Sequence, residues 1–259
     1  MVLMTFTPVQ PDKTRVWGCD ISFWQDQDET PQKVDFRKMK AGGASFVFIR
    51  AGQNKWRDPD FADFWGAAKG IIPRGAYFYL DSRASMKDQA RVLADALFMD
   101  PGELPYAIDF EQVASKKAGI NTQLTISHFN DFYGWMQEFL PMYKKQPICY
   151  TGYYFWRDFG SSNALYSHFP LWIARYKAAE PLVPAPWTKA SFWQWTDGGP
   201  GKELGVESNA IDLNYFMGTR EEFDKLSDNG GVPQPAVSDR NAILDEAIKA
   251  IERLKDFDK

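Results

Sequence analysis

Two acids end an otherwise apolar segment, YAIDFE, at residues 106–111. An ionised carboxylate is costly among apolar side chains unless it is paired or hydrogen-bonded, so Asp109 and Glu111 need a reason to be there. Side chains at positions i and i+2 of a strand point to the same face, which places these two together. Because neighbouring carboxylates repel, the pKa of one of them is expected to rise until it keeps its proton near neutral pH. A protonated carboxyl beside an ionised one is the arrangement that cleaves glycosidic bonds.

Two further apolar segments carry an acid. Asp20 lies near the end of VWGCDI (16–21), and Asp212 lies within AIDLNYF (210–216). A single acid at the end of a strand often caps a turn or a helix. Four acids on three apolar strands are better explained by one cleft onto which all three strands open.

Aromatic residues make up 16% of the chain, with 10 Trp and 11 Tyr. Any one ring is more often part of a core than of a binding site, and alternation along a strand lets only some rings face a cleft. Rings beside hydroxyl-binding acids would form a saccharide groove. The candidate substrate-binding residues are Tyr77, Tyr79, Tyr150, Trp172, Tyr176 and Trp195.

Composition argues against several other functions. The formal net charge of −4 leaves no basic footprint for nucleic acid. With two His, no H-E-x-x-H motif and no Cys/His cluster, a metal site lacks its ligands, and the nucleotide-binding glycine motifs are missing as well. Cys19 and Cys149 lie in apolar segments and are predicted to be buried free thiols.

Strands and helices that alternate along the chain must position these residues. Alternation predicts βαβ units and a parallel sheet, and eight strands suit a closed α/β barrel of the TIM type. After about residue 160 the strands follow one another without full helices between them, so we expect an irregular barrel with fewer helices in its second half. An open doubly wound sheet is the alternative, but no glycine-rich turn follows the first strand. The predicted strands are 16–21, 45–51, 75–80, 106–111, 146–151, 170–176, 191–196 and 210–216, and the predicted helices are about 34–42, 59–69, 85–99 and 122–144.

The end of the chain is predicted to be separate from a barrel domain that spans residues 1–226. Within that domain, residues 219–226 form a closing helix. Residues 227–239 form a Gly/Pro linker, and the C-terminal part, 240–259, contains an amphipathic helix at 241–257. A helix of about 17 residues is marginal alone and needs a surface to pack on. Docking on the barrel, self-association and the remnant of a linker to a wall-binding module all remain open.

The order of the apolar segments resembles a known family. The segments GCDISFWQ, FVFIRAG, GAYFYL, AIDFE, YTGYYF, PLWIARY, FWQWT and IDLNYF occur in the order found in glycoside hydrolase family 25, which contains phage endolysins and bacterial and fungal muramidases. The resemblance covers about residues 15–226. It implies an irregular barrel that hydrolyses the β-1,4 bond between N-acetylmuramic acid and N-acetylglucosamine in peptidoglycan, without a metal or an organic cofactor.

The resemblance also implies roles for the four acids. The Glu of the D-x-E motif is the general acid in this family, which corresponds to Glu111, and Asp109 assists it or orients the substrate. The acids of the first-strand and last-strand motifs correspond to Asp20 and Asp212. Three routes stay open: attack by the acetamido oxygen of the substrate with Asp109 steadying it, direct action of a carboxylate, and inversion through an activated water.

Other functions compete with this one. Family 18 chitinases end a strand in D-x-x-D-x-D-x-E, and Ala107 stands where that motif needs the Asp two before Asp109. A non-catalytic wall-binding barrel and a virion-associated structural protein are the remaining alternatives. The first 16 residues do not read as a secretory signal and no segment is long enough to span a membrane, so we expect an endolysin made in the host cytoplasm that reaches the wall after a holin opens the membrane.

Overall fold

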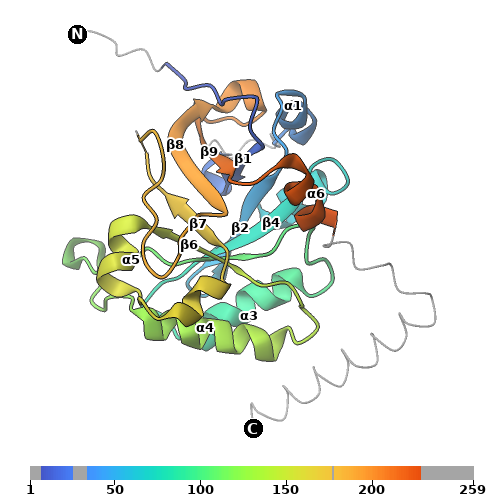
Figure 1. The fold of residues 1–259 in the computed structure, drawn as a ribbon. Helices are drawn as coiled ribbons and strands as arrows, with labels where there is room; N and C mark the ends of the chain where they lie inside the picture. The colour runs from blue at the N-terminus through green and yellow to red at the C-terminus, as the bar shows by residue number, and fades with distance from the viewer. Residues whose placement is uncertain (1–6, 26–33, 177, 229–259) are drawn as a thin grey trace.

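Eight strands close into a barrel in the computed structural model, which describes residues 7–25, 34–176 and 178–228 (Figure 1). The sheet has the order β1-β9-β8-β7-β6-β5-β4-β2-β3, and β1 also pairs with β2, which closes the ring. The short strand β3 pairs with β2 and stands outside the ring. The predicted irregular α/β barrel is therefore confirmed. The strands are β1 (Trp17–Ile21), β2 (Val47–Gln53), β3 (Trp56–Arg57), β4 (Arg74–Tyr79), β5 (Ala107–Asp109), β6 (Ile148–Gly152), β7 (Leu171–Ala174), β8 (Phe192–Pro200) and β9 (Ala210–Phe216).

Helices cover the first half of the barrel more fully than the second, as expected. The two longest, α3 and α4, lie side by side outside the strands (Figure 1). Between β7 and β8, and between β8 and β9, the described residues form no α-helix. The α-helices are α1 (Phe36–Ala41), α2 (Phe61–Ala68), α3 (Met86–Leu97), α4 (Ile126–Phe139), α5 (Tyr153–Phe159) and α6 (Arg220–Asp228), and the 3-10 helices are η1 (Phe23–Gln25), η2 (Lys116–Ala118), η3 (Ala164–His168) and η4 (Gly201–Leu204).

The sheet is mixed, whereas the alternation of strands and helices predicted a parallel sheet. Strand β9 runs antiparallel to both of its neighbours, β1 and β8. A parallel connection needs a crossover of a dozen or more residues, and residues 201–209 between β8 and β9 are too few for one. The chain therefore turns back on itself and closes the barrel with an antiparallel strand.

Several element boundaries also differ from the predicted ones. Helix α4 begins after Thr125, whose side chain and that of His128 cap its first turn, and it ends before Pro141, which cannot continue a helix. Strand β3 and helix α5 were not predicted, since the aromatic run YYFWRDF of α5 is typical of strands. Helix α6 extends two residues into the predicted linker. The rest of that linker and the predicted helix at 241–257 lie outside the described residues.

Two cores hold the barrel together, which explains why most strands read as continuous apolar runs. The outer core lies between the strands and the helices, and it includes Cys19, which is a buried free thiol as predicted. Cys149 is also buried and free. None of the described helices is long and apolar enough to cross a bilayer.

The inner core fills the end of the barrel at which the parallel strands begin. Phe48 stacks on Trp172 with ring centroids 4.5 Å apart and meets Phe192 edge-on at 5.3 Å. Helix α6 closes this end of the barrel with Phe223. Gly75 is required here, because a Cβ atom at that position would lie 2.3 Å from the Phe48 ring. This end of the barrel therefore has a packed apolar floor.

Candidate active site

A cleft of about 390 Å³ opens above this floor, at the carboxyl ends of the parallel strands. All four predicted acids line it: Asp20 from β1, Asp109 from β5, Glu111 just after β5, and Asp212 from β9. The carboxyl ends of parallel barrel strands are where enzymes of this architecture place their catalytic groups. The structure thus brings together the acids that the sequence places on three separate segments.

Glu111 lies just beyond β5 and not within it as predicted. The ladder nevertheless continues, because the Phe110 N–H donates to the Tyr150 carbonyl at 2.9 Å and the Leu80 N–H donates to the Asp109 carbonyl at 3.0 Å. Phe110 is fully buried in the outer core. The side chains on either side of it, Asp109 and Glu111, both reach the cleft, as i and i+2 spacing predicts.

Both carboxyls of this pair have a raised pKa, whereas the sequence argument expected only one. Burial raises the pKa of Glu111 to about 7, and the negative charge of Asp20 adds to the effect. Burial, followed by the charges of Glu111 and Asp20, raises the pKa of Asp109 well above its ordinary value, and Arg50 opposes this rise. The pair therefore retains a proton near neutral pH, which is what a proton donor in glycoside hydrolysis requires.

Asp20 and Asp212 form a second pair, directly opposite each other on the antiparallel strands β1 and β9. Asp20 Oδ2 accepts hydrogen bonds from Gln194 Nε2 at 2.9 Å and Asn214 Nδ2 at 2.8 Å. Burial raises the pKa of Asp20, while these two bonds and a third from Asp212 oppose the rise. Burial and the negative charge of the neighbouring Asp20 raise the pKa of Asp212 to about 9. Asp212 therefore stays protonated, and its O–H donates a hydrogen bond to the Asp20 carboxylate.

Five of the six predicted aromatic residues line the cleft: Tyr77, Tyr79, Tyr150, Trp172 and Tyr176. Three of them also fix the amides that hold Asp20. The hydroxyls of Tyr150 and Tyr176 each donate to Gln194 Oε1 at 2.8 Å, and Trp172 Nε1 donates to Asn214 Oδ1 at 2.7 Å. With their oxygens occupied, both amides present their NH₂ groups to Asp20.

Trp195 is the one predicted substrate-binding residue that the structure does not bring to the cleft. Its ring stacks on Tyr215 at 5.1 Å, with the ring planes 11° apart. Its neighbour Gln194 is the residue of this strand that faces the cleft, and alternation sends Trp195 to the other face.

Comparisons with known proteins identify the family of the chain. Residues 19–204 match the sequence profile of glycosyl hydrolases family 25. The chain is 28% identical over 227 residues to "Lysozyme M1" of Streptomyces globisporus, covering 84% of this chain and 73% of that protein.

Solved structures share the fold. A muramidase from Acremonium alcalophilum aligns with a TM-score of 0.65 at 26% identity over 83% of this chain and 100% of that one. The catalytic domain of the endolysin ply40 from bacteriophage P40 of Listeria monocytogenes aligns with a TM-score of 0.62 at 20% identity over 82% of this chain and 97% of that one.

The chain belongs to glycosyl hydrolase family 25. The family resemblance of its ordered segments is therefore confirmed, and the chain is a glycoside hydrolase.

Sequence reasoning missed several residues of this family 25 cleft. Gln194 lines the cleft, and Asn214 supports it through its hydrogen bond to Asp20. Both had a usable signal, since each is a buried polar residue within an apolar strand. Trp24 of η1 lines the cleft and is 55% exposed, with its ring 4.4 Å from that of Phe23. Arg50 of β2 also lines the cleft and is only 7% exposed.

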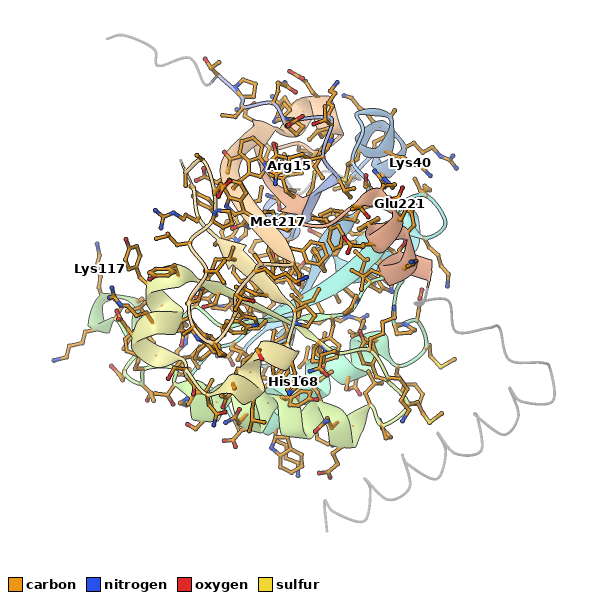
Figure 2. All side chains as sticks on the ribbon, viewed as in Figure 1. Arg15, Lys40, Lys117, His168, Met217 and Glu221 are labelled. Atoms are coloured by element: carbon orange, nitrogen blue, oxygen red, sulfur yellow. The ribbon has the colours of Figure 1, made fainter. Side chains whose placement is uncertain are left out.

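Acid–base chemistry in this family 25 barrel falls to carboxyl groups, because neither histidine lines the cleft. His128 caps α4. His168 is exposed at the end of η3 and does not line the cleft (Figure 2). Among the described residues, no three or more His, Cys, Asp and Glu side chains are placed so that they could hold a metal ion.

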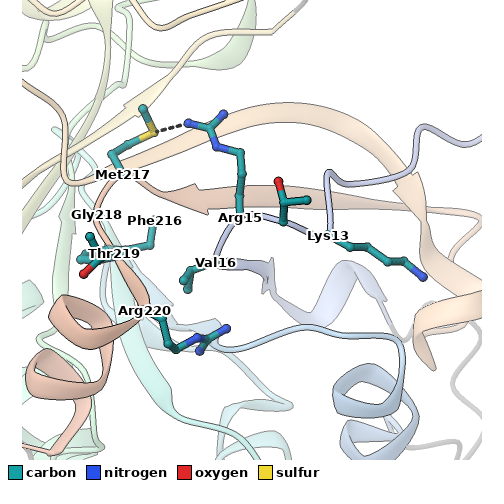
Figure 3. A pocket seen from close by; sticks show the side chains of 9 residues that line it. Lys13, Arg15, Val16, Phe216, Met217, Gly218, Thr219 and Arg220 are labelled. Carbon is teal, nitrogen blue, oxygen red and sulfur yellow. Dashed lines mark hydrogen bonds between the residues drawn. The ribbon is translucent and has the colours of Figure 1, made fainter.

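A second hollow, of about 300 Å³, lies near the other end of the barrel (Figure 3). Arg15 crosses it and donates to Met217 Sδ at 3.6 Å. None of the described residues lining it is an acid, so it offers no proton donor for this chemistry. Its lining residues are Lys13, Thr14, Arg15, Val16, Phe216, Met217, Gly218, Thr219 and Arg220.

Proposed function

We propose that this family 25 enzyme is a lysozyme (N-acetylmuramidase) that hydrolyses the β-1,4 bond between N-acetylmuramic acid and N-acetylglucosamine in bacterial peptidoglycan. One observation carries the proposal. Glu111 lies beside Asp109 in a cleft whose base is the packed apolar floor of the barrel, and its pKa is raised to about 7. A carboxyl of that pKa is protonated in a large fraction of molecules at neutral pH and can still release its proton. The lysozyme and muramidase names of the relatives support the same substrate.

Each acid has a distinct task in this proposal. Glu111 donates its proton to the glycosidic oxygen as the bond from that oxygen to carbon 1 breaks, and water supplies the hydroxyl that carbon 1 finally carries. The transition state then carries positive charge on the sugar ring, and the hydrogen-bonded Asp20 carboxylate supplies fixed negative charge above a dry floor. Asp109, whose buried Oδ1 has no hydrogen-bond partner among the described residues, assists Glu111 or orients the substrate beside it. Asp212 retains its proton and supports Asp20.

The test is the clearing of a peptidoglycan suspension by the unsubstituted protein and by Glu111→Gln. Loss of the general acid should lower the rate by roughly 10²- to 10⁴-fold. Glu138→Gln, an exposed position on α4, is the matched control and should keep full activity. Mass spectrometry of the products should find muramic acid at the new reducing ends. Full activity of Glu111→Gln would show that the assigned role is wrong, and binding to walls without new reducing ends would favour the non-catalytic barrel.

The biological setting we propose is phage-induced lysis of a bacterial host, with release to the wall through a holin. The fold shared with the endolysin ply40 catalytic domain is compatible with this setting. The protein expressed inside host cells should leave them intact until the membrane is permeabilised, and lysis should then follow within minutes. Lysis of equal rate without permeabilisation would contradict a holin-dependent route.

A further inference from the structure

Two exposed aromatic side chains line the cleft that holds the four acids. Trp24 is 55% exposed and Tyr176 is 41% exposed, and both belong to the lining of that one cleft. The proposed chemistry uses the hydroxyl of Tyr176 but neither aromatic ring. Apolar ring surface that faces water in a substrate cleft gains free energy when a ligand with an apolar face covers it.

Both rings are held in place before a ligand arrives. The ring of Trp24 lies 4.4 Å from that of Phe23, with the two planes 31° apart. Phe23 is fixed in turn by the guanidinium of Arg50, which lies 4.8 Å from the centre of its ring. On the other side, the hydroxyl of Tyr176 donates to Gln194 Oε1 at 2.8 Å. Binding to such rings costs little side-chain entropy, because their orientation is already set.

The order of the strands places the two rings on opposite sides of the barrel mouth. Trp24 follows β1, and its neighbour Phe23 packs on Arg50 of β2, so this ring lies at the rim where β1 meets β2. Tyr176 follows β7, which is reached from that rim through β9 and β8 in one direction and through β4, β5 and β6 in the other. Tilted strands that lie roughly 4.8 Å apart make an eight-stranded ring roughly 15 Å across. This span exceeds one pyranose ring, so the two aromatic rings meet different sugars of one chain.

The acids lie on both sides of the line that joins the two rings. Strand β5, which carries Asp109 and leads to Glu111, is on one side of this line, and β9, which carries Asp212, is on the other. A chain that rests on both rings therefore passes between the two pairs of acids. Glycoside hydrolysis needs this arrangement, because carboxyl groups must flank the bond that breaks.

Resting on the proposed muramidase function, we infer that Trp24 and Tyr176 are stacking platforms at the two ends of the cleft. The glycan lies across the barrel mouth from one ring to the other, and each ring covers the apolar face of one sugar. β-1,4-linked sugars suit such platforms, since their equatorial substituents leave flat faces of C–H groups. The two rings hold the chain on both sides of the bond beside Glu111, and the protein gains affinity from sugars beyond a single disaccharide.

The test measures the binding of peptide-free glycan strands to the full chain by calorimetry, in a Glu111→Gln background that prevents turnover. With strands of four disaccharide units, Trp24→Ala and Tyr176→Ala should each weaken binding by about 5- to 10-fold, which is the loss of one stacked ring. The double variant should lose about 25- to 100-fold, since the two rings are too far apart to share a contact. A single disaccharide cannot reach both rings, so on it the double variant should lose at most about 5- to 10-fold.

Conservative variants separate stacking from other roles. Trp24→Phe and Tyr176→Phe keep an aromatic ring and should keep most of the affinity, although Tyr176→Phe removes the hydroxyl that donates to Gln194. Phe98→Ala is the matched control, because Phe98 is 43% exposed at the end of α3 and does not line the cleft. This control should bind both glycans as its Glu111→Gln parent does. Circular dichroism should show that the compared variants are folded.

The outcomes distinguish this inference from the proposed function. A loss by the double variant that is no larger on long strands than on the disaccharide would overturn the inference. Equal losses in the Phe and Ala variants would overturn it as well, because the rings would then not be what binds. Both results leave the muramidase function intact. Absence of wall hydrolysis by the unsubstituted protein would instead overturn the proposed function, whatever the rings contribute to binding.

Discussion

Replacing Glu111 by Gln should stabilise the protein at alkaline pH and leave its stability unchanged in acid. The pKa of Glu111 rises from an ordinary 4.5 to about 7 on folding, mainly through burial. At 1.36 kcal/mol for each tenfold change in the proton equilibrium, this rise corresponds to roughly 3 kcal/mol. Below about pH 4.5 both the folded and the unfolded chain bind the proton, and no penalty exists. Above about pH 7 the folded chain must keep an ionised carboxylate in the cleft, and this amount of stability is lost.

Urea unfolding followed by tryptophan fluorescence measures this difference directly. At pH 8.5 the free energy of unfolding of Glu111→Gln should exceed that of the unsubstituted protein by up to about 3 kcal/mol, or about 6–12 °C in melting temperature. At pH 4 the two proteins should agree. Glu138→Gln, exposed on α4, should follow the unsubstituted protein at both pH values. An equal effect of Glu111→Gln at both pH values would refute the burial argument, and with it the reason for assigning the proton donor to this residue.

Two other substitutions probe the layers below Glu111. Asn214→Ala removes a 2.8 Å bond to Asp20 and leaves Trp172 Nε1 without its acceptor, so kcat on peptidoglycan should fall by about 10- to 100-fold, as expected for a hydrogen bond to a charged group. Because the bond from Asn214 lowers the pKa of Asp20, its loss should also shift the pH–rate profile. A profile identical to that of the unsubstituted protein would contradict this role. Phe48→Ala opens a cavity in the packed floor and should lower the free energy of unfolding by about 3–5 kcal/mol, whereas Met142→Ala, at a position 65% exposed, should change it little in the same denaturation assay.

The strands and the four acids could be predicted from the sequence because both signals are local. Strands buried on two faces read as apolar runs, and a charge inside such a run stands out for its desolvation cost. The same signal marks Arg50 in FVFIRA, a cation in an apolar strand, and it leads to the cleft as directly as the acids do.

The direction of β9 and the placement of Trp195 could not be predicted in this way. The residues of a strand show which positions are buried but not which way the strand runs, since both directions satisfy the same apolar pattern. The register between β8 and β9 also shifts after Gln194. A shift of one residue exchanges the two faces of a strand, so a pattern of alternating Trp and polar residues does not identify the inward-facing set.

The layers inside the barrel separate what folds the chain from what gives it activity. At the bottom, Phe48 and its aromatic neighbours exclude water. In the middle, the side-chain amides of Gln194 and Asn214 accept hydrogen bonds from aromatic side chains and donate hydrogen bonds to Asp20. Hydrogen bonds are stronger above a dry floor, because the local dielectric constant is low. The acids at the top obtain their raised pKa from the same exclusion of water. Substitutions in the floor should therefore change stability first, and substitutions in the amide layer should change the pH dependence of catalysis in a chain that still folds.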